Sequence, residues 1–81
     1  MMTKSQVFKL IRQAMGNPRQ MPDNFWLEYE ETVNCWNAGW NQGPTADDVV
    51  KALERQNLNL EARAFPDYVD MNETIRLWEE S

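Results

Sequence analysis

The side chains that most often perform acid–base and nucleophilic chemistry are scarce in this chain of 81 residues. It contains no histidine, so neither a Ser-His nor a Cys-His pair can form. Adjacent carboxylates occur at Glu30-Glu31 and Asp47-Asp48, but neighbouring residues of a helix point in different directions. Hydrolysis by two carboxylates also needs a cleft, which a small helical bundle rarely provides. These residues predict a protein that is not an enzyme and has no catalytic residue.

The spacing of potential ligands argues against a bound metal or cofactor. The single cysteine, Cys35, can form neither an intrachain disulfide nor a cysteine metal cluster. Glu28, Glu31 and Asp47 supply oxygen ligands, but their spacing matches no calcium-binding loop. The three glycines are isolated from one another, so no glycine-rich loop is available to hold a phosphate group. We therefore expect no metal site and no cofactor.

Charge is distributed unevenly along the chain, whose net charge is −5. Residues 1–22 carry four basic residues and no acid, whereas residues 23–81 carry four basic residues against all thirteen acids, which gives +4 and −9. Because Lys and Arg make the phosphate contacts of DNA-binding proteins, direct binding to nucleic acid is not expected. An acidic surface that meets a basic partner is one explanation of this balance, and solubility alone is the other.

No targeting or membrane-spanning segment is expected. The first five residues lack the apolar core of a signal peptide, and no run approaches the roughly 18 apolar residues that cross a bilayer. A lone cysteine fits a reducing compartment. We therefore expect a cytoplasmic protein that does not contact membranes.

Two amphipathic helices, over residues 4–15 and 46–56, are predicted from apolar periodicity and from signals at their ends. In the first, Val7-Leu10-Ile11-Ala14 follows the i, i+3, i+4, i+7 spacing, and Gly16-Asn17-Pro18 ends the helix. The second begins with Thr45-Ala46-Asp47-Asp48, which matches a capping pattern and places two acids in the first turn, where the helix dipole favours them.

An aromatic stripe predicts a longer helix over residues 24–38. Asp23 or Asn24 can cap its start, and Gly39 closes it. Large side chains recur in it at intervals of three to four residues, namely Phe25, Tyr29, Val33 (or Thr32), Trp36 and Trp40.

The last third of the chain is less regular. In 58–69, Leu58, Leu60, Ala62 and Ala64 alternate as in a strand, but no other segment alternates to pair with it, so we favour an irregular or helical conformation. A further start signal precedes a predicted helix over 71–80. The sequence therefore predicts an all-α fold, a small bundle of three to four short helices in a single domain over residues 1–81.

The first functional hypothesis is a small acidic inhibitor or adaptor that docks an acidic helical face on a basic, nucleic-acid-handling protein, because carboxylates can occupy a groove that phosphates would fill. Most tryptophans are expected in the core, with one or two as contact anchors. In size and acidity the chain resembles phage anti-defence proteins, many anti-CRISPR proteins included, although no sequence motif carries the likeness. The candidate partner-binding residues are Trp26, Glu28, Glu30, Glu31, Trp40, Asp47, Asp48 and Glu54.

The second hypothesis is a homo-oligomeric helical protein that has a structural role or binds a small ligand. A chain this short has a small core, and a second copy, as in a homodimer, can complete it. Such an assembly can hold a small ligand in its grooves, although no residue indicates which ligand. Binding that weakens steeply with salt favours the first hypothesis, and a mass above that of one chain favours the second.

Overall fold

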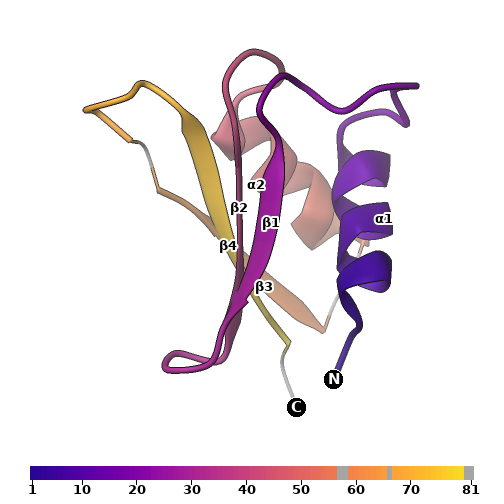
Figure 1. Ribbon diagram of the computed structural model, residues 1–81. Helices are drawn as coiled ribbons and strands as arrows, with labels where there is room; N and C mark the ends of the chain where they lie inside the picture. The colour runs from indigo at the N-terminus through magenta and orange to yellow at the C-terminus, as the bar shows by residue number, and fades with distance from the viewer. Residues whose placement is uncertain (57–58, 66, 80–81) are drawn as a thin grey trace.

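The computed structural model describes residues 1–56, 59–65 and 67–79 and has an α+β fold (Figure 1). The described residues form two helices and four strands. In chain order these are α1 (Lys4–Ala14), β1 (Trp26–Glu30), β2 (Cys35–Trp40), α2 (Ala46–Gln56), β3 (Leu60–Ala64) and β4 (Glu73–Glu79).

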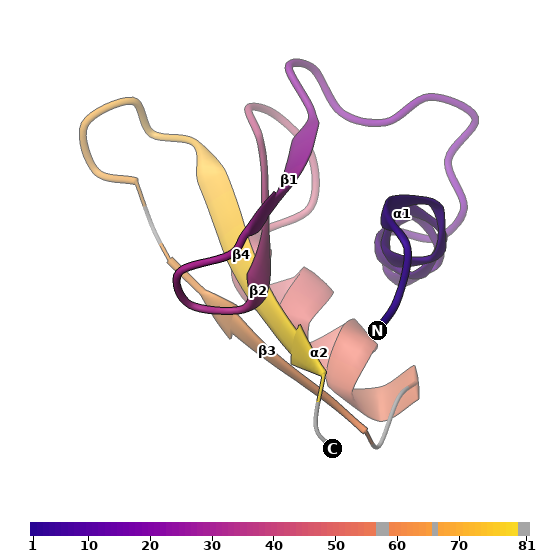
Figure 2. The same ribbon diagram turned by 60° about the horizontal axis from the view of Figure 1, so that its bottom comes forward.

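The four strands form one antiparallel sheet in the order β1-β2-β4-β3, so β1 and β3 are its edges. Helix α2 packs mainly on β3, and α1 packs on α2 and beside β1. Figure 2 shows both helices on the same side of the sheet. The sheet therefore has one face covered by helices and one face that no described helix covers.

The core lies between the helices and the covered face. Trp40 is completely buried, its indole Nε1 donates a hydrogen bond to the carbonyl oxygen of Pro44 at 2.9 Å, and its ring stacks on Phe25 with centroids 6.4 Å apart. Alternate strand residues and one stripe of each helix supply the rest, namely Leu27, Trp36, Ala38, Leu60, Ala62, Ile75 and Leu77 from the strands, and Val7, Ile11, Ala46, Val49 and Leu53 from the helices.

The two helices predicted near residues 4–15 and 46–56 are present. Before α1, the Thr3 hydroxyl accepts a hydrogen bond from the backbone N–H of Gln6 at 3.2 Å, and the Gln6 side chain accepts one from the N–H of Thr3 at 2.8 Å. After it, Gly16 has a φ of +88°, a left-handed conformation that costs glycine little. At α2, the Thr45 hydroxyl accepts from the N–H of Asp48 at 3.1 Å.

The helix predicted over residues 24–38 is wrong, because this segment is the hairpin β1–β2. Its aromatic residues are spaced at three to four residues, but Trp36, Ala38 and Trp40 also alternate, and all three point to the covered face. The turn at 31–34 reverses the chain, and Asn34 adopts there a left-handed φ of +51°, which Asn tolerates better than most residues. Pairing with a neighbouring strand therefore overrides the local helical periodicity.

The helix predicted over 71–80 is also wrong, because β4 occupies this segment, with Ile75 and Leu77 buried. Strand β4 is the partner that the alternation of Leu60, Ala62 and Ala64 requires, so 58–69 contains β3 where an irregular or helical segment was expected. Residues 57, 58, 66, 80 and 81, and with them parts of these two predictions, lie outside the described residues. The predicted all-α helical bundle is therefore wrong, and the chain has an α+β fold.

Candidate functional site

The uncovered face of the sheet, here called the open face, carries three rows of side chains that the strand register aligns. The aromatic row, the charged row and the third row each cross the sheet from β1 through β2 and β4 to β3. Phe65 follows β3 and continues its ladder, because its N–H donates to the carbonyl of Thr74 at 2.8 Å. The rows are, in that order, Trp26-Gly39-Thr74-Phe65, Glu28-Asn37-Arg76-Arg63 and Glu30-Cys35-Trp78-Glu61.

The aromatic row has large rings at its two ends and small residues between them. The Trp26 ring lies directly over Gly39, where a Cβ atom would stand only 2.6 Å from the indole Nε1. Trp26 is 39% exposed and Phe65 is 41% exposed. Together with Asn37 and Arg76, these rings border a hollow of about 220 Å³, which is large enough for a single side chain.

The charged row runs from an acid at the β1 edge to two arginines. Arg63 and Arg76 are direct cross-strand partners, an arrangement of like charges that destabilises a sheet unless something compensates it. Arg63 pairs with Glu61 at 2.8 Å, and the Arg76 guanidinium lies over the Phe65 ring, 4.6 Å from its centroid. Among the described residues, no carboxylate lies within ion-pair distance of Arg76.

The third row contains the one cysteine. Cys35 is completely buried although it belongs to the open face, and its Sγ lies 3.8 Å from the side-chain oxygen of Asn37. Burial raises the pKa of its thiol above the ordinary value, while Arg76 lowers it and Glu30 raises it by smaller amounts. The thiol is therefore protonated at neutral pH, which does not favour a nucleophile.

The structure divides the acidic residues that the sequence singled out between two surfaces. Glu28 and Glu30 project from β1 on the open face, and Glu31 begins the turn after β1. Asp47, Asp48 and Glu54 are exposed on α2, on the helix-covered side of the sheet. The six carboxylates therefore do not form one acidic face.

The two tryptophans chosen as contact anchors have opposite environments. Trp26 is partly exposed on the open face, whereas Trp40 is completely buried in the core and is not available to a partner. Sequence reasoning missed the residues that complete the open face with Trp26, because they belong to strands that were not predicted. These are Asn37, Arg63, Phe65, Thr74, Arg76 and Trp78.

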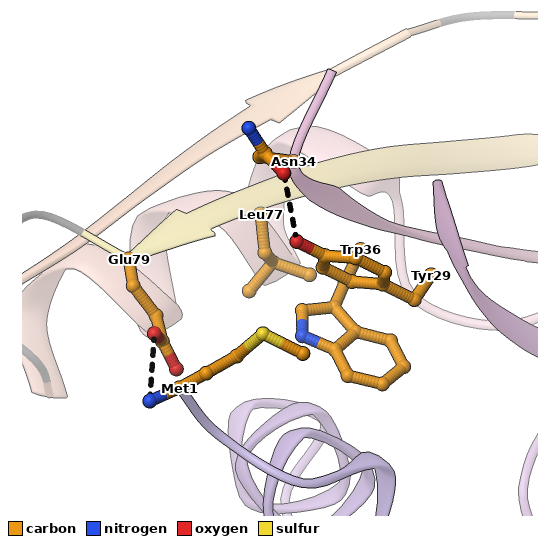
Figure 3. A pocket seen from close by; sticks show the side chains of 6 residues that line it. All are labelled: Met1, Tyr29, Asn34, Trp36, Leu77 and Glu79. Atoms are coloured by element: carbon orange, nitrogen blue, oxygen red, sulfur yellow. Dashed lines mark hydrogen bonds and ion pairs between the residues drawn. The ribbon is translucent and has the colours of Figure 1, made fainter. Parts of the chain in front are cut away.

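A second hollow, of about 190 Å³, lies where the N-terminus passes the covered face (Figure 3). The Tyr29 and Trp36 rings meet there edge to face with centroids 5.0 Å apart, and the Tyr29 hydroxyl hydrogen-bonds Asn34 at 3.2 Å. The N-terminal amine lies 3.8 Å from the Glu79 carboxylate. Because its two charged groups face each other, this hollow offers little to a charged ligand.

The connection between β3 and β4 exposes several apolar side chains. The Asp67 carboxylate shapes this loop by accepting hydrogen bonds from the N–H groups of Val69 and Asp70, both at 3.1 Å. Tyr68, Val69 and Met71 are largely exposed at its tip, which stands away from the rest of the chain in Figure 1. The loop therefore adds exposed apolar surface between Phe65 and β4 in the chain.

Chemical groups for metal binding are not gathered anywhere in the described part of the chain, where no three Cys, Asp or Glu side chains lie close enough to hold an ion. Neither described helix is long and apolar enough to cross a membrane. What the open face offers instead is aromatic surface with charges of both signs, which suits binding. The chain matches no protein-family model, no curated protein and no solved structure.

Proposed function

We propose that this chain is a non-catalytic inhibitor or adaptor that docks on a basic surface of a nucleic-acid-handling protein. The docking surface is the β1 side of the open face, where Glu28 and Glu30 follow Trp26 along the strand and form an acidic rim that the exposed Glu31 continues into the turn. The observation that carries the proposal is the partly exposed Trp26 indole, which is seated on Gly39 and shares one face of β1 with Glu28 and Glu30.

The physical support lies in how firmly these groups are held. Tryptophan is enriched among the residues that dominate binding energies. Because the Trp26 ring rests on Gly39, it loses less conformational freedom on binding than a free side chain. The Glu30 carboxylate accepts a hydrogen bond from Asn37 at 2.7 Å, which fixes its orientation as well. Docking therefore requires little reordering of this surface.

The charge of the rim indicates the kind of partner. Carboxylates held in place can pair with the Lys and Arg side chains that otherwise contact phosphate groups. A protein that docks in this way competes with nucleic acid for its partner, which is the expected mode of action of an inhibitor of the phage anti-defence or anti-CRISPR type. The rim belongs to a β-hairpin, so it replaces the acidic helical face expected from the sequence.

The test is a pull-down from bacterial lysate at low and high salt, read by mass spectrometry, that compares Glu28→Lys with Glu54→Lys. Both substitutions change the net charge equally, and both side chains are exposed, on opposite sides of the sheet. We expect the chain and Glu54→Lys to recover a nucleic-acid-handling protein at low salt. We expect Glu28→Lys, Trp26→Ala and high salt each to abolish this recovery.

Several results would contradict the proposal. Binding that survives Glu28→Lys but not Glu54→Lys would assign the interface to α2. Binding that does not depend on salt would leave the acidic rim without a role, and a captured partner that does not handle nucleic acid would exclude competition with phosphates.

A further inference from the structure

The open face has a pattern of charge and shape that complements itself. In the charged row, Glu28 lies at the β1 edge and Arg63 lies at the β3 edge. In the aromatic row, Trp26 and Phe65 occupy the same two edges. The acid and the indole at the β1 edge thus complement the base and the phenyl ring at the β3 edge of the same face.

Identical sheets that pack face to face with aligned strands are related by a two-fold axis that is either parallel or perpendicular to the strands, and this pattern selects one of these two arrangements. An axis parallel to the strands, between β2 and β4, places β1 of each copy over β3 of the other, so Glu28 faces Arg63 and Trp26 faces Phe65 of the second copy. An axis perpendicular to the strands places Glu28 over Glu28 and Arg76 over Arg76, which is repulsive. Only the first arrangement is complementary.

We propose that two copies of the chain form a dimer through their open faces, about a two-fold axis parallel to the strands. Aligned sheets pack about 10 Å apart, at about 30° to each other, which allows side chains of the two faces to interdigitate. The residues in contact are Trp26 with Phe65, Glu28 with Arg63, and Asn37 with Arg76, each pair formed twice by symmetry.

The dimer relieves two unfavourable features of the open face of a single copy, its concentration of positive charge and its exposed aromatic surface. Arg76 stands beside Arg63 in the same sheet and has no carboxylate within ion-pair distance among the described residues, and the second copy adds its Glu28 carboxylate to this positive surface. The exposed parts of the Trp26 and Phe65 rings are removed from water. One contact opposes the pairing, because Glu30 approaches Glu61 of the second copy. Each of these carboxylates already has a partner in its own chain, Asn37 and Arg63 respectively.

The size of the open face limits the strength of the dimer. Four strands and five residues along each give a face of about 19 Å by 17 Å. This footprint is small beside the roughly 800 Å² that each partner buries in a standard stable interface. We therefore expect a reversible dimer with a dissociation constant in the micromolar range or weaker. The inference does not depend on the proposed function, but both use the acidic rim, so a basic partner and the second copy compete for it.

A charge exchange tests the arrangement. Glu28→Arg places an arginine opposite Arg63 of the second copy, and Arg63→Glu places a glutamate opposite Glu28, so each variant alone is expected to be monomeric. Mixed in equal amounts, the two variants restore both ion pairs and are expected to form a heterodimer. Sedimentation equilibrium and native mass spectrometry measure the states, with Glu54→Arg on α2 as the control that keeps the dimer.

The mixing step also shows that both variants are folded, because only folded chains can recover the dimer. The proposal is overturned if the natural chain is monomeric up to millimolar concentration, if either single variant dimerises as well as the natural chain, or if the mixture remains monomeric. None of these measurements involves another protein. Failure of the dimer therefore leaves the docking proposal standing, and failure of the pull-down leaves the dimer standing.

Discussion

The two faces of the sheet are built from alternate residues of the same four strands, yet they differ in almost every physical property. The covered face consists mainly of apolar side chains, most of them buried, such as Trp40 and Leu77. The open face alternates rings with charges of both signs, as in Trp26, Glu28 and Arg76. The covered face therefore supplies the core that stabilises the fold, and the open face is the surface on which the proposed binding depends.

The largest expected difference between the two faces is the effect of removing a tryptophan side chain from each. Trp40→Ala removes a completely buried indole and its hydrogen bond to Pro44, so we expect a loss of about 3–5 kcal/mol in the free energy of unfolding. Trp26→Ala removes a partly exposed ring, and we expect about 1 kcal/mol. Urea denaturation measures both.

A loss of 3–5 kcal/mol approaches the whole stability of a small domain, so Trp40→Ala is expected to be largely unfolded. Trp40→Phe keeps most of the apolar volume and provides an intermediate value if Trp40→Ala cannot be measured. Equal losses at Trp26 and Trp40 would mean that the open face also stabilises the fold, and the two faces would then no longer be distinct.

The contact between Trp26 and Gly39 is the closest packing that a substitution can test on the open face. Gly39 has no left-handed φ, so alanine suits its backbone, but the new Cβ would overlap the Trp26 indole. We expect Gly39→Ala to cost about 1–3 kcal/mol when Trp26 is present. In the Trp26→Ala background the same substitution should be neutral or slightly stabilising, since glycine weakens a strand.

The difference between the two backgrounds is the coupling energy of the pair, which a double-mutant cycle measures by urea denaturation. A coupling energy near zero would show that the Trp26 ring does not rest on Gly39 in solution. The ring would then be a loose side chain, and the argument that it is held ready for a partner would fail.

The two faces also explain which parts of the fold could be read from the sequence. Helices α1 and α2 were predicted because their periodicity and caps are local signals. Strand β2 was missed because most of its residues are buried on both faces, so Cys35 to Trp40 shows no clean alternation of apolar and polar residues. Strand β3 did alternate, but its partner β4 was assigned to a helix, and a strand is stable only with its partner.

The sequence predicted only part of the candidate site, again because the pairing of the strands was not recognised. Trp26, Glu28 and Glu30 were identified by residue type, and their place on one face of β1 follows from the period of two of a strand. Arg63 and Arg76 were overlooked because only the β3–β4 register brings them together. The alternation of Thr74, Arg76 and Trp78 with Ile75 and Leu77 was the available signal for that register.

Cys35 differs from the exposed side chains of the open face, and its effect on the free energy of unfolding is expected to be the smallest of those considered. It points to the open side but is completely buried, and burial raises the pKa of its thiol. The unfolded chain therefore releases the thiol proton near pH 8.5, while the folded chain retains it to higher pH. Between these values the unfolded chain binds fewer protons, so the free energy of unfolding falls as pH rises.

Comparing the natural chain with Cys35→Ala from pH 7 to 10 by urea denaturation isolates this contribution, because the two proteins differ in no other ionisable group. Since one proton is involved, the natural chain should lose at most about 1.4 kcal/mol per pH unit more than the variant. Parallel curves would show that the thiol titrates as it does in water. The third row would then be open to solvent at Cys35, and the complete burial of this side chain would not hold in solution.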